Sequence, residues 1–404
     1  MNVYKKIIIK SICVILAVVI TPLFIFIGIN YGDKILDVTG SMAASSAKMS
    51  FGNNTDYITE LSKKLGATLI NEPSNEFYRV NVGGKSTWAI DMAPNETEAS
   101  NNSKKNTKTY KSIVENSDSI TVNNPLPYPD EIENHDGDIE DVHYGTYSDT
   151  SFVTLDSGAQ VRNCTKLSNN KILKQSEKTP DFNIELNSDN PQVLIYHTHT
   201  TESFEPYSRD YYDKSFSCKT TDADKNMIRV GNAICKQLEK NGIKTVHSTT
   251  IHDYPDYNSA YDLSYNTVTK ILKKYPSIKV VLDIHRDAIE KENGLRLSPI
   301  TEVNGKRAAQ LMIISCADYA DGSMGMPKFL DNLTFACSLQ SQIEADYPGL
   351  ERPILFDYRN YNQSLSTGAL LIEVGSHGNS LDEAVYTGKL LGKSLSRNLM
   401  NISK

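Results

Sequence analysis

The sequence has little of what marks the disulfide-rich, cysteine-zinc or nucleic-acid-binding classes. Its 404 residues include 6 cysteines, none in C-x-x-C spacing, so the cysteines are expected to be buried thiols. The formal net charge is -7 and the sequence shows no basic patch, which argues against nucleic acid as a partner. There is no internal repeat, and the acidic residues fit no calcium-binding loop.

Long apolar runs are also scarce, with one exception near the N-terminus. Residues 11–29 carry no charge and follow Lys5, Lys6 and Lys10. A run of this length suits one transmembrane helix of about 20 residues, and its basic flank should stay in the cytoplasm. A cleaved secretory signal is the alternative, but its apolar region would be shorter, and the small residues 41–45 lie well beyond the run. We expect a single-pass cell-membrane protein whose remainder is extracytoplasmic.

Composition divides the chain into four parts. Residues 1–32 form the cytoplasmic tip and transmembrane anchor, and 33–95 a small membrane-proximal element. Residues 96–157 are rich in Asn, Ser, Lys and Asp and are interpreted as a low-complexity linker. Residues 158–404 alternate strand and helix signals, which predicts an α/β catalytic domain with a mostly parallel sheet sandwiched by helices. The expected core strands are 193–196, 244–248, 278–284 and 310–315, and the expected helices are 224–240, 259–275, 327–347 and 381–399.

Three apolar runs are each followed by polar residues of catalytic type. His197 to Glu202 follow residues 193–196, His285 follows 280–284, and Glu373 follows 369–372. Continuous apolar runs of this length are typical of buried parallel strands. Ligands in such folds collect at the C-terminal ends of the strands. The three segments are therefore expected to meet at one edge of the sheet.

The residue types in these segments suit a hydrolytic zinc site. Catalytic zinc usually has three protein ligands and one open position for water, and His199, Glu202 and His285 provide two imidazoles and a carboxylate. Glu373 is the candidate general base. An alternative is that His285 lies in a surface ion-pair cluster with Asp283, Arg286 and Asp287. Equally, Asp283 or Asp287 could orient a metal-bound imidazole.

Three further residues near these segments are candidates for a role in the site. His197 either binds the metal in place of His199 or packs and orients the loop. His377 either contacts substrate or caps the following helix, and Arg286 is a further candidate for substrate contact.

The motifs Tyr196–Ser203, Asp283–Asp287, and Ile372–Gly375 followed by His377–Asn379 resemble the stage II sporulation protein P family. The resemblance covers roughly residues 158 to 402. It implies a zinc-dependent N-acetylmuramoyl-L-alanine amidase fold and hydrolysis of peptidoglycan during engulfment in endospore formation. It also implies an endopeptidase activity on the peptide cross-links, and stage II sporulation proteins D and M as partners.

Carried over by position, the resemblance implies Zn²⁺ ligands at His199, Glu202 and His285 and a catalytic role for Glu373. It favours His199 over His197. The ligand carboxylate of the wider amidase superfamily opens the helix after the first strand, where this chain has no Glu. Glu202 is the nearby carboxylate of the right type, with Glu205 and Asp210 as substitutes.

Two other functions fit the same residues. One is a membrane-tethered scaffold that binds the wall through an inactive form of the site, which the presence of all four residues disfavours. The other is a zinc carboxypeptidase, which needs a cation for the free carboxylate of its substrate. The candidate cations are Arg286, Arg296, Arg352 and Arg359.

Overall fold

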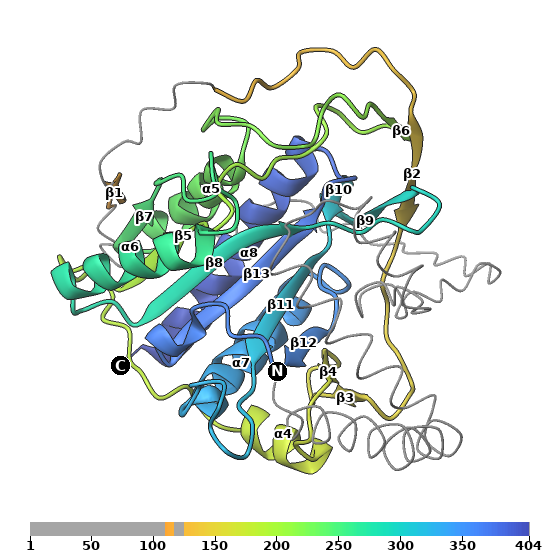
Figure 1. The fold of residues 1–404 in the computed structure, drawn as a ribbon. Helices are drawn as coiled ribbons and strands as arrows, with labels where there is room; N and C mark the ends of the chain where they lie inside the picture. The colour runs from red at the N-terminus through yellow and green to blue at the C-terminus, as the bar shows by residue number, and fades with distance from the viewer. Residues whose placement is uncertain (1–109, 117–124, 404) are drawn as a thin grey trace, which may run out of the picture. The chain divides into compact units, whose positions relative to one another are not determined.

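Apolar strands and amphipathic helices are arranged around one long mixed sheet in this computed structural model (Figure 1). The structure describes residues 110–116 and 125–403, so the predicted anchor (1–32) and membrane-proximal element (33–95) lie outside the described residues. Over the ranges that are described, no helix combines the length and apolar character needed to cross a membrane.

Within residues 110–116 and 125–403, the large sheet has nine strands. In spatial order these are β1 (Ile113–Glu115), β7 (Thr245–Ser248), β5 (Val193–Tyr196), β8 (Val280–Asp287), β13 (Gly368–Ser376), β11 (Leu311–Cys316), β12 (Ile354–Asp357), β4 (Gln160–Asn163) and β3 (Phe152–Thr154). Neighbouring strands are parallel except at the β13–β11 and β4–β3 junctions. The prediction of a mostly parallel sheet is confirmed, and the antiparallel β13–β11 junction was not predicted.

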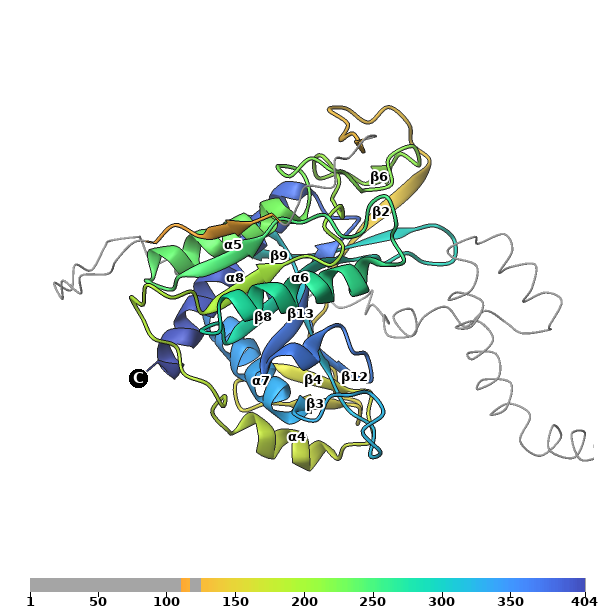
Figure 2. The same ribbon diagram turned by 60° about the vertical axis from the view of Figure 1, so that its left-hand side comes forward.

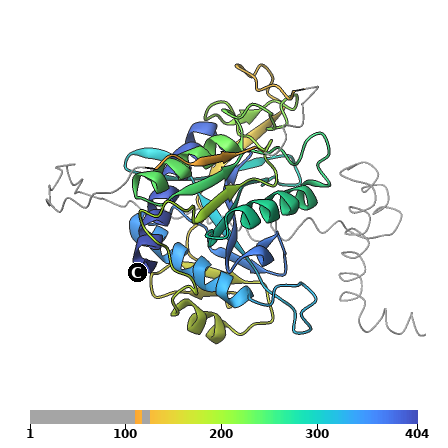
Figure 3. The ribbon, with the colours of Figure 1, turned by 90° about the vertical axis from the view of Figure 1, so that its left-hand side faces the viewer.

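Helices cover both faces of this sheet, as the side-chain alternation of the strands requires. Val193 and Ile195 pack into the main core with α5 (Met227–Lys240), α7 (Phe329–Asp346) and α8 (Leu381–Ile402). Leu194 and Tyr196 point to the other face and pack against α6 (Ala260–Lys274). Figures 2 and 3 show α6 on one side of the sheet and α5 and α8 on the other. Burial on both faces explains why these strands are apolar throughout.

The remaining elements extend this framework. Helix α4 (Asn169–Ser176) packs against α7, where the Gln175 side chain donates to Thr334 Oγ1 at 2.6 Å. The 3₁₀-helix Gln363–Leu365 leads into β13. A second, smaller sheet has the strand order β10 (Lys306–Ala309), β9 (Arg296–Val303), β2 (Gly137–Val142) and β6 (Tyr211–Tyr212).

The prediction of a linker over 96–157 is wrong for the described part of that range. β1 lies beside β7 at one edge of the large sheet, β3 pairs with β4 at the other edge, and β2 pairs with β9 in the small sheet. The acidic residues of β2 suggested a solvated segment, but Asp141 forms an ion pair with Arg307 at 2.8 Å while Ile139 and Val142 are buried. The folded domain therefore begins before residue 158.

Candidate active site

Strand register brings His285 and Glu373 together. The two residues are direct partners in the parallel β8–β13 pair, so their side chains leave the sheet side by side on one face. Alternation along β8 puts Asp283 on this face too, which is the face that α6 covers. At the same level β5 ends at Tyr196, the register partner of Asp283.

The chain leaves β5 in a tight turn that is held by Asp283. Thr198 donates to this carboxylate twice, from its backbone N–H at 2.8 Å and from Oγ1 at 2.6 Å. The backbone N–H of Glu202 then donates to His199 O at 3.2 Å. Because the turn folds back on β8, the ring of His199 lies nearly perpendicular to that of His285, with their centroids 5.3 Å apart.

Glu202 completes the group. Its Oε2 lies 3.7 Å from His285 Nδ1 and accepts the backbone N–H of Arg286 at 3.2 Å. Burial raises the pKa of Glu202, and the positive charges of Arg286 and His285 oppose this. The structure thus brings together the four residues that the sequence singles out; we call His199, Glu202, His285 and Glu373 the strand-end cluster.

Asp283 orients the imidazole of His285. Its Oδ1 lies 2.8 Å from His285 Nε2, which leaves Nδ1 facing Glu202. Burial alone would lower the pKa of His285, but the Asp283 carboxylate, helped by Glu202 and Glu373, raises it to about 10. A carboxylate behind an imidazole is the arrangement that fixes ring orientation in metal sites.

Three atoms of the strand-end cluster are buried without a hydrogen-bond partner: His199 Nδ1, His285 Nε2 and Glu373 Oε2. His285 Nε2 has the ion-pair contact with Asp283, and the other two atoms have neither kind of partner. Burial, followed by the charge of His285, lowers the pKa of His199 to about 3, so its imidazole is neutral and keeps a lone pair. Burial and then the nearby Asp287 carboxylate raise the pKa of Glu373 to about 8. Orphaned polar atoms of this kind are uncommon in folded proteins and point to a function.

The donor types of the cluster suit zinc. Two imidazoles and one carboxylate are among the ligand sets of catalytic zinc sites, and His199 offers an unpartnered nitrogen. In the described ranges, however, no three His, Cys, Asp or Glu side chains are arranged as a metal site. The residues fit the ion chemically once His285 gives up its Nδ1 proton, as metal binding requires, and their side chains would have to draw together around it.

His197 lies on the opposite face of the sheet from His285. Its Nδ1 donates to Ile284 O at 2.9 Å, and its Nε2 lies 3.0 Å from Nε2 of His247. Burial lowers the pKa of His197 to about 4, so the pair is neutral. Gly231 leaves room for it, since a Cβ there would lie 2.5 Å from His247 Nε2 and 2.8 Å from His197 Nε2. Because both of its ring nitrogens already have partners, His197 is a packing residue with no free nitrogen for a metal. This supports His199 as the ligand candidate.

Arg286 and His377 contact other groups. Arg286 Nε donates to Ser203 O at 2.9 Å and Nη2 to Cys218 O at 3.1 Å, so its guanidinium anchors the loop that follows Glu202. His377 Nε2 lies 3.5 Å from Glu290, and burial lowers the pKa of His377 to about 4.

The two substitute carboxylates lie differently from Glu202. Glu205 is ion-paired with Arg209 and Arg296, and Asp210 is exposed. Glu202 is the carboxylate that reaches His285.

Sequence reasoning missed the aromatic wall of the site. Tyr257 stacks on His199 with centroids 4.2 Å apart and planes 6° apart, and Tyr261 meets the same imidazole edge-on at 5.5 Å. Tyr361 in turn stacks on Tyr261 at 5.3 Å. The i, i+4 spacing of the first two tyrosines, just where a helix begins, is the signal that could have revealed them.

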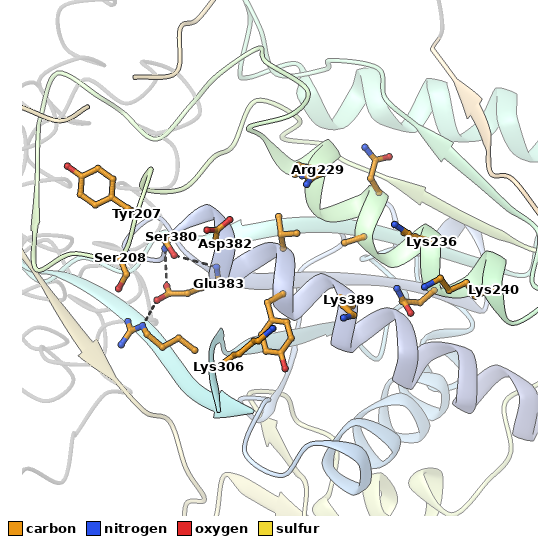
Figure 4. A pocket seen from close by; sticks show the side chains of 16 residues that line it. Tyr207, Ser208, Arg229, Lys236, Lys240, Lys306, Ser380, Asp382, Glu383 and Lys389 are labelled. Atoms are coloured by element: carbon orange, nitrogen blue, oxygen red, sulfur yellow. Dashed lines mark hydrogen bonds and ion pairs between the residues drawn. The ribbon is translucent and has the colours of Figure 1, made fainter. Parts of the chain in front are cut away.

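A cavity of about 810 Å³ lies elsewhere, along α5 and α8 (Figure 4), and none of the four cluster residues lines it. We call it the α5–α8 cavity. Six cations line it: Arg229, Lys236, Lys240, Lys306, Arg307 and Lys389. Arg307 is bound by Asp141 and Glu383. Across the described residues, Arg229, Lys236, Lys240 and Lys389 make no ion pair.

Fold and site together define a class: a mixed α/β protein that carries a buried His/Glu cluster at the C-terminal ends of β5, β8 and β13. The family model described as Stage II sporulation protein P matches residues 89–396. The chain belongs to this family. It is 29% identical over 206 residues to stage II sporulation protein P of Bacillus subtilis (strain 168), an alignment that covers 48% of each chain, so the match spans about half the length of that relative.

Solved structures of amidases are more distant. N-acetylmuramoyl-L-alanine amidase AmiC2 of Nostoc punctiforme is 11% identical with a TM-score of 0.31, and the match covers 52% of this chain and 96% of that one. N-acetylmuramoyl-L-alanine amidase of Clostridium difficile 630 is 16% identical with a TM-score of 0.29, covering 53% and 97%. The CwlD amidase of Clostridioides difficile, solved in complex with the GerS lipoprotein, is 11% identical with a TM-score of 0.32, covering 52% and 99%. Similarity at this level does not establish an activity.

Proposed function

We propose that this chain is a zinc-dependent peptidoglycan hydrolase, an N-acetylmuramoyl-L-alanine amidase that cleaves the amide between the lactyl group of muramate and L-alanine. The observation that carries the proposal is the convergence of His199, Glu202, His285 and Glu373 at one sheet edge. In two of these side chains, His199 and Glu373, a buried atom has neither a hydrogen bond nor an ion pair. Membership of the stage II sporulation protein P family agrees with this activity.

The residues divide the work between binding and proton transfer. His199, Glu202 and His285 would hold Zn²⁺, which when bound lowers the pKa of its water to about 7 and polarises a carbonyl. Asp283 keeps Nδ1 of His285 turned toward the cluster. Glu373 accepts the proton of the attacking water and returns it to the leaving amine. A carboxyl group whose pKa lies near 8 is suited to both steps close to neutral pH.

The setting of this activity is proposed from the sequence and the family. The uncharged run at 11–29 supports a single-pass cell-membrane protein with an extracytoplasmic catalytic domain. The family supports a role in sporulation, for which we propose wall hydrolysis during engulfment, with stage II sporulation proteins D and M as partners. An endopeptidase activity on peptide cross-links belongs to the same proposal.

Digestion of purified cell wall tests the amidase. The full-length protein should release free stem peptides that begin with L-alanine, identified by mass analysis. Release should stop on chelation, return with added Zn²⁺, and be absent in Glu373→Gln. The exposed Glu177→Gln is the matched control. Wall binding without any released fragment would contradict the proposal and favour a scaffold. Loss of cross-link cleavage in the same variant would show that both activities share one site.

Elemental analysis tests the ligands independently of turnover. We expect about one zinc per chain in the wild-type protein, and a large loss of zinc in His199→Ala and in His285→Ala. His135→Ala, a change at a half-exposed histidine outside the cluster, serves as the control. Unchanged zinc content in both cluster variants would overturn the assignment.

A further inference from the structure

Lys219 is a cation beside the strand-end cluster that lacks an anionic partner. It forms an isolated antiparallel bridge with Glu202, so the two residues lie side by side. Its side chain is half-buried. Within the ranges that the structure describes, its Nζ makes no ion pair and no hydrogen bond. Burial lowers the pKa of Lys219, and Asp253 and Glu202 oppose this without reaching ion-pair distance.

The contact that Lys219 does make is with an exposed aromatic ring. Its Nζ lies 3.9 Å from the centroid of Tyr257, and the same ring stacks on His199 at 4.2 Å. Tyr257 is 38% exposed, so solvent and substrate can reach this place. The ring therefore connects a candidate zinc ligand to an ammonium group at the mouth of the site. A cation held over an aromatic face is stabilised, but it keeps donors that an anion could use.

The arginines considered for such a role are already engaged. Arg286 donates to three backbone carbonyls, and Arg296 pairs with Glu205 and Glu290. Arg352 pairs with Asp287, and Arg359 pairs with Asp357. A partly desolvated charge is costly unless it is paired. Lys219 is the cation at this edge that an incoming anion would satisfy.

We propose that Lys219, supported by the ring of Tyr257, forms a subsite that binds a carboxylate on the peptide side of the substrate. This inference rests on the proposed amidase function, because the scissile amide belongs to L-alanine and the next residue of the stem peptide carries a carboxylate or its amide. That group lies about one residue spacing, ~3.8 Å between Cα atoms, beyond the alanine. The Tyr257 centroid lies 3.9 Å from Lys219 Nζ and 4.2 Å from the His199 centroid, so the ammonium is at most about 8 Å from the imidazole, a distance that two residues of extended peptide can span.

The test compares two synthetic muropeptides that differ in one group, a free carboxylate or a carboxamide on the second residue. Binding to the full-length Glu373→Gln protein, supplied with Zn²⁺, is measured by calorimetry so that turnover plays no part. A charge-assisted hydrogen bond should favour the carboxylate about 10-fold. Adding Lys219→Met should bring the two affinities within about twofold, and Lys219→Arg should keep most of the preference. Lys214→Met, at an exposed lysine of the same loop, is the matched control.

Each outcome decides between the subsite and other roles for Lys219. Equal weakening of both ligands by Lys219→Met would assign the residue a structural role, and an unchanged preference would remove it from recognition; either result overturns the subsite, as does failure of both ligands to bind. Melting temperatures of the variants separate misfolding from lost recognition. A Lys219-dependent preference in a protein that digests no wall would keep the subsite and refute the amidase. In an active enzyme, Lys219→Met should raise KM for the carboxylate substrate more than it lowers kcat.

Discussion

The strand-end cluster and the α5–α8 cavity differ in almost every property. The cavity offers about 810 Å³, with exposed cations that solvent already satisfies. In the cluster, His199, Glu202 and His285 are buried, and His199 Nδ1 and Glu373 Oε2 have neither a hydrogen bond nor an ion pair. Buried polar groups cost free energy unless they are paired, so a fold keeps them unpaired where they serve a purpose. In this protein the candidate chemistry and the α5–α8 cavity lie in different places.

Glu373→Gln should have the largest effect on activity, because it removes the proton acceptor and leaves an isosteric amide. We expect kcat for wall hydrolysis to fall by about 10²–10⁴. The melting temperature should stay the same or rise, since the change removes a buried carboxyl group that burial disfavours. Residual activity within a few fold of wild type would place the proton transfer on another residue.

Asp283→Asn should have a smaller effect, because Asp283 acts through the candidate zinc ligand His285 and not on the substrate. The amide lacks the negative charge that holds the His285 imidazole in place. It also weakens the two hydrogen bonds that Thr198 donates to Asp283. We expect a 10- to 100-fold loss in zinc affinity, measured by competition with a chelator. Asp224→Asn, at an exposed position, should leave zinc affinity unchanged. Equal zinc affinity in the two variants would mean that Asp283 only shapes the loop.

Acid should destabilise the folded protein, because buried histidines resist protonation. The pKa of His377 is lowered from 6.5 to about 4 by burial, with Arg286 and Arg296 adding to the effect and Glu290 opposing it. In the unfolded chain His377 takes up a proton below pH 6.5, whereas in the folded chain it does so only near pH 4. The stability that comes from the lowered pKa of His377 is therefore fully present above pH 6.5 and is lost as the pH falls toward 4. The loss for this residue is about 2 kcal/mol at pH 5.

Denaturant unfolding at pH 7 and pH 5 measures this loss. His377→Gln should reduce the difference between the two pH values without abolishing it, because burial also lowers the pKa of His247. An unchanged difference in the variant would show that His377 is protonated in the folded protein at pH 5.

The smallest effect is expected in the cavity. Joint replacement of Lys236, Lys240 and Lys389 by Gln should leave the rate of wall hydrolysis within about twofold. The free energy of unfolding should change by no more than about 0.5 kcal/mol per site, as is usual for exposed positions. A larger loss of hydrolysis would show that the α5–α8 cavity takes part in catalysis or substrate binding, so that function would not belong to the strand-end cluster alone.

The sequence predicted most of the fold because the strands of the central sheet are apolar on both faces. A strand that is apolar on both faces must be buried on both, which places it between two helical layers. This applies to residues 193–196 and 280–284. It failed at β2, where Asp138, Glu140 and Asp141 suggested a solvated linker. The partners that hold Glu140 and Asp141, Lys291 and Arg307, come from more than 150 residues away and leave no local pattern.

The site was predictable to the same extent. Polar residues that directly follow apolar strands identified the four cluster residues, since strand ends meet at one edge. The face that each side chain occupies was less accessible, because His197 and His199 are separated by a turn whose shape depends on Asp283. Lys219 comes from a loop without periodicity, so its approach to the Tyr257 ring beside His199 could not be deduced from spacing.

The position of β13 in the sheet has a consequence for the timing of protein synthesis. This strand lies between β8 and β11, yet it follows both of them in the sequence and so leaves the ribosome after the strands that flank it. Glu373 reaches His285 only when β13 inserts between strands made much earlier. A chain that has not yet been synthesised as far as β13 therefore lacks the pair, and any chemistry that depends on the pair is withheld until this strand has been made.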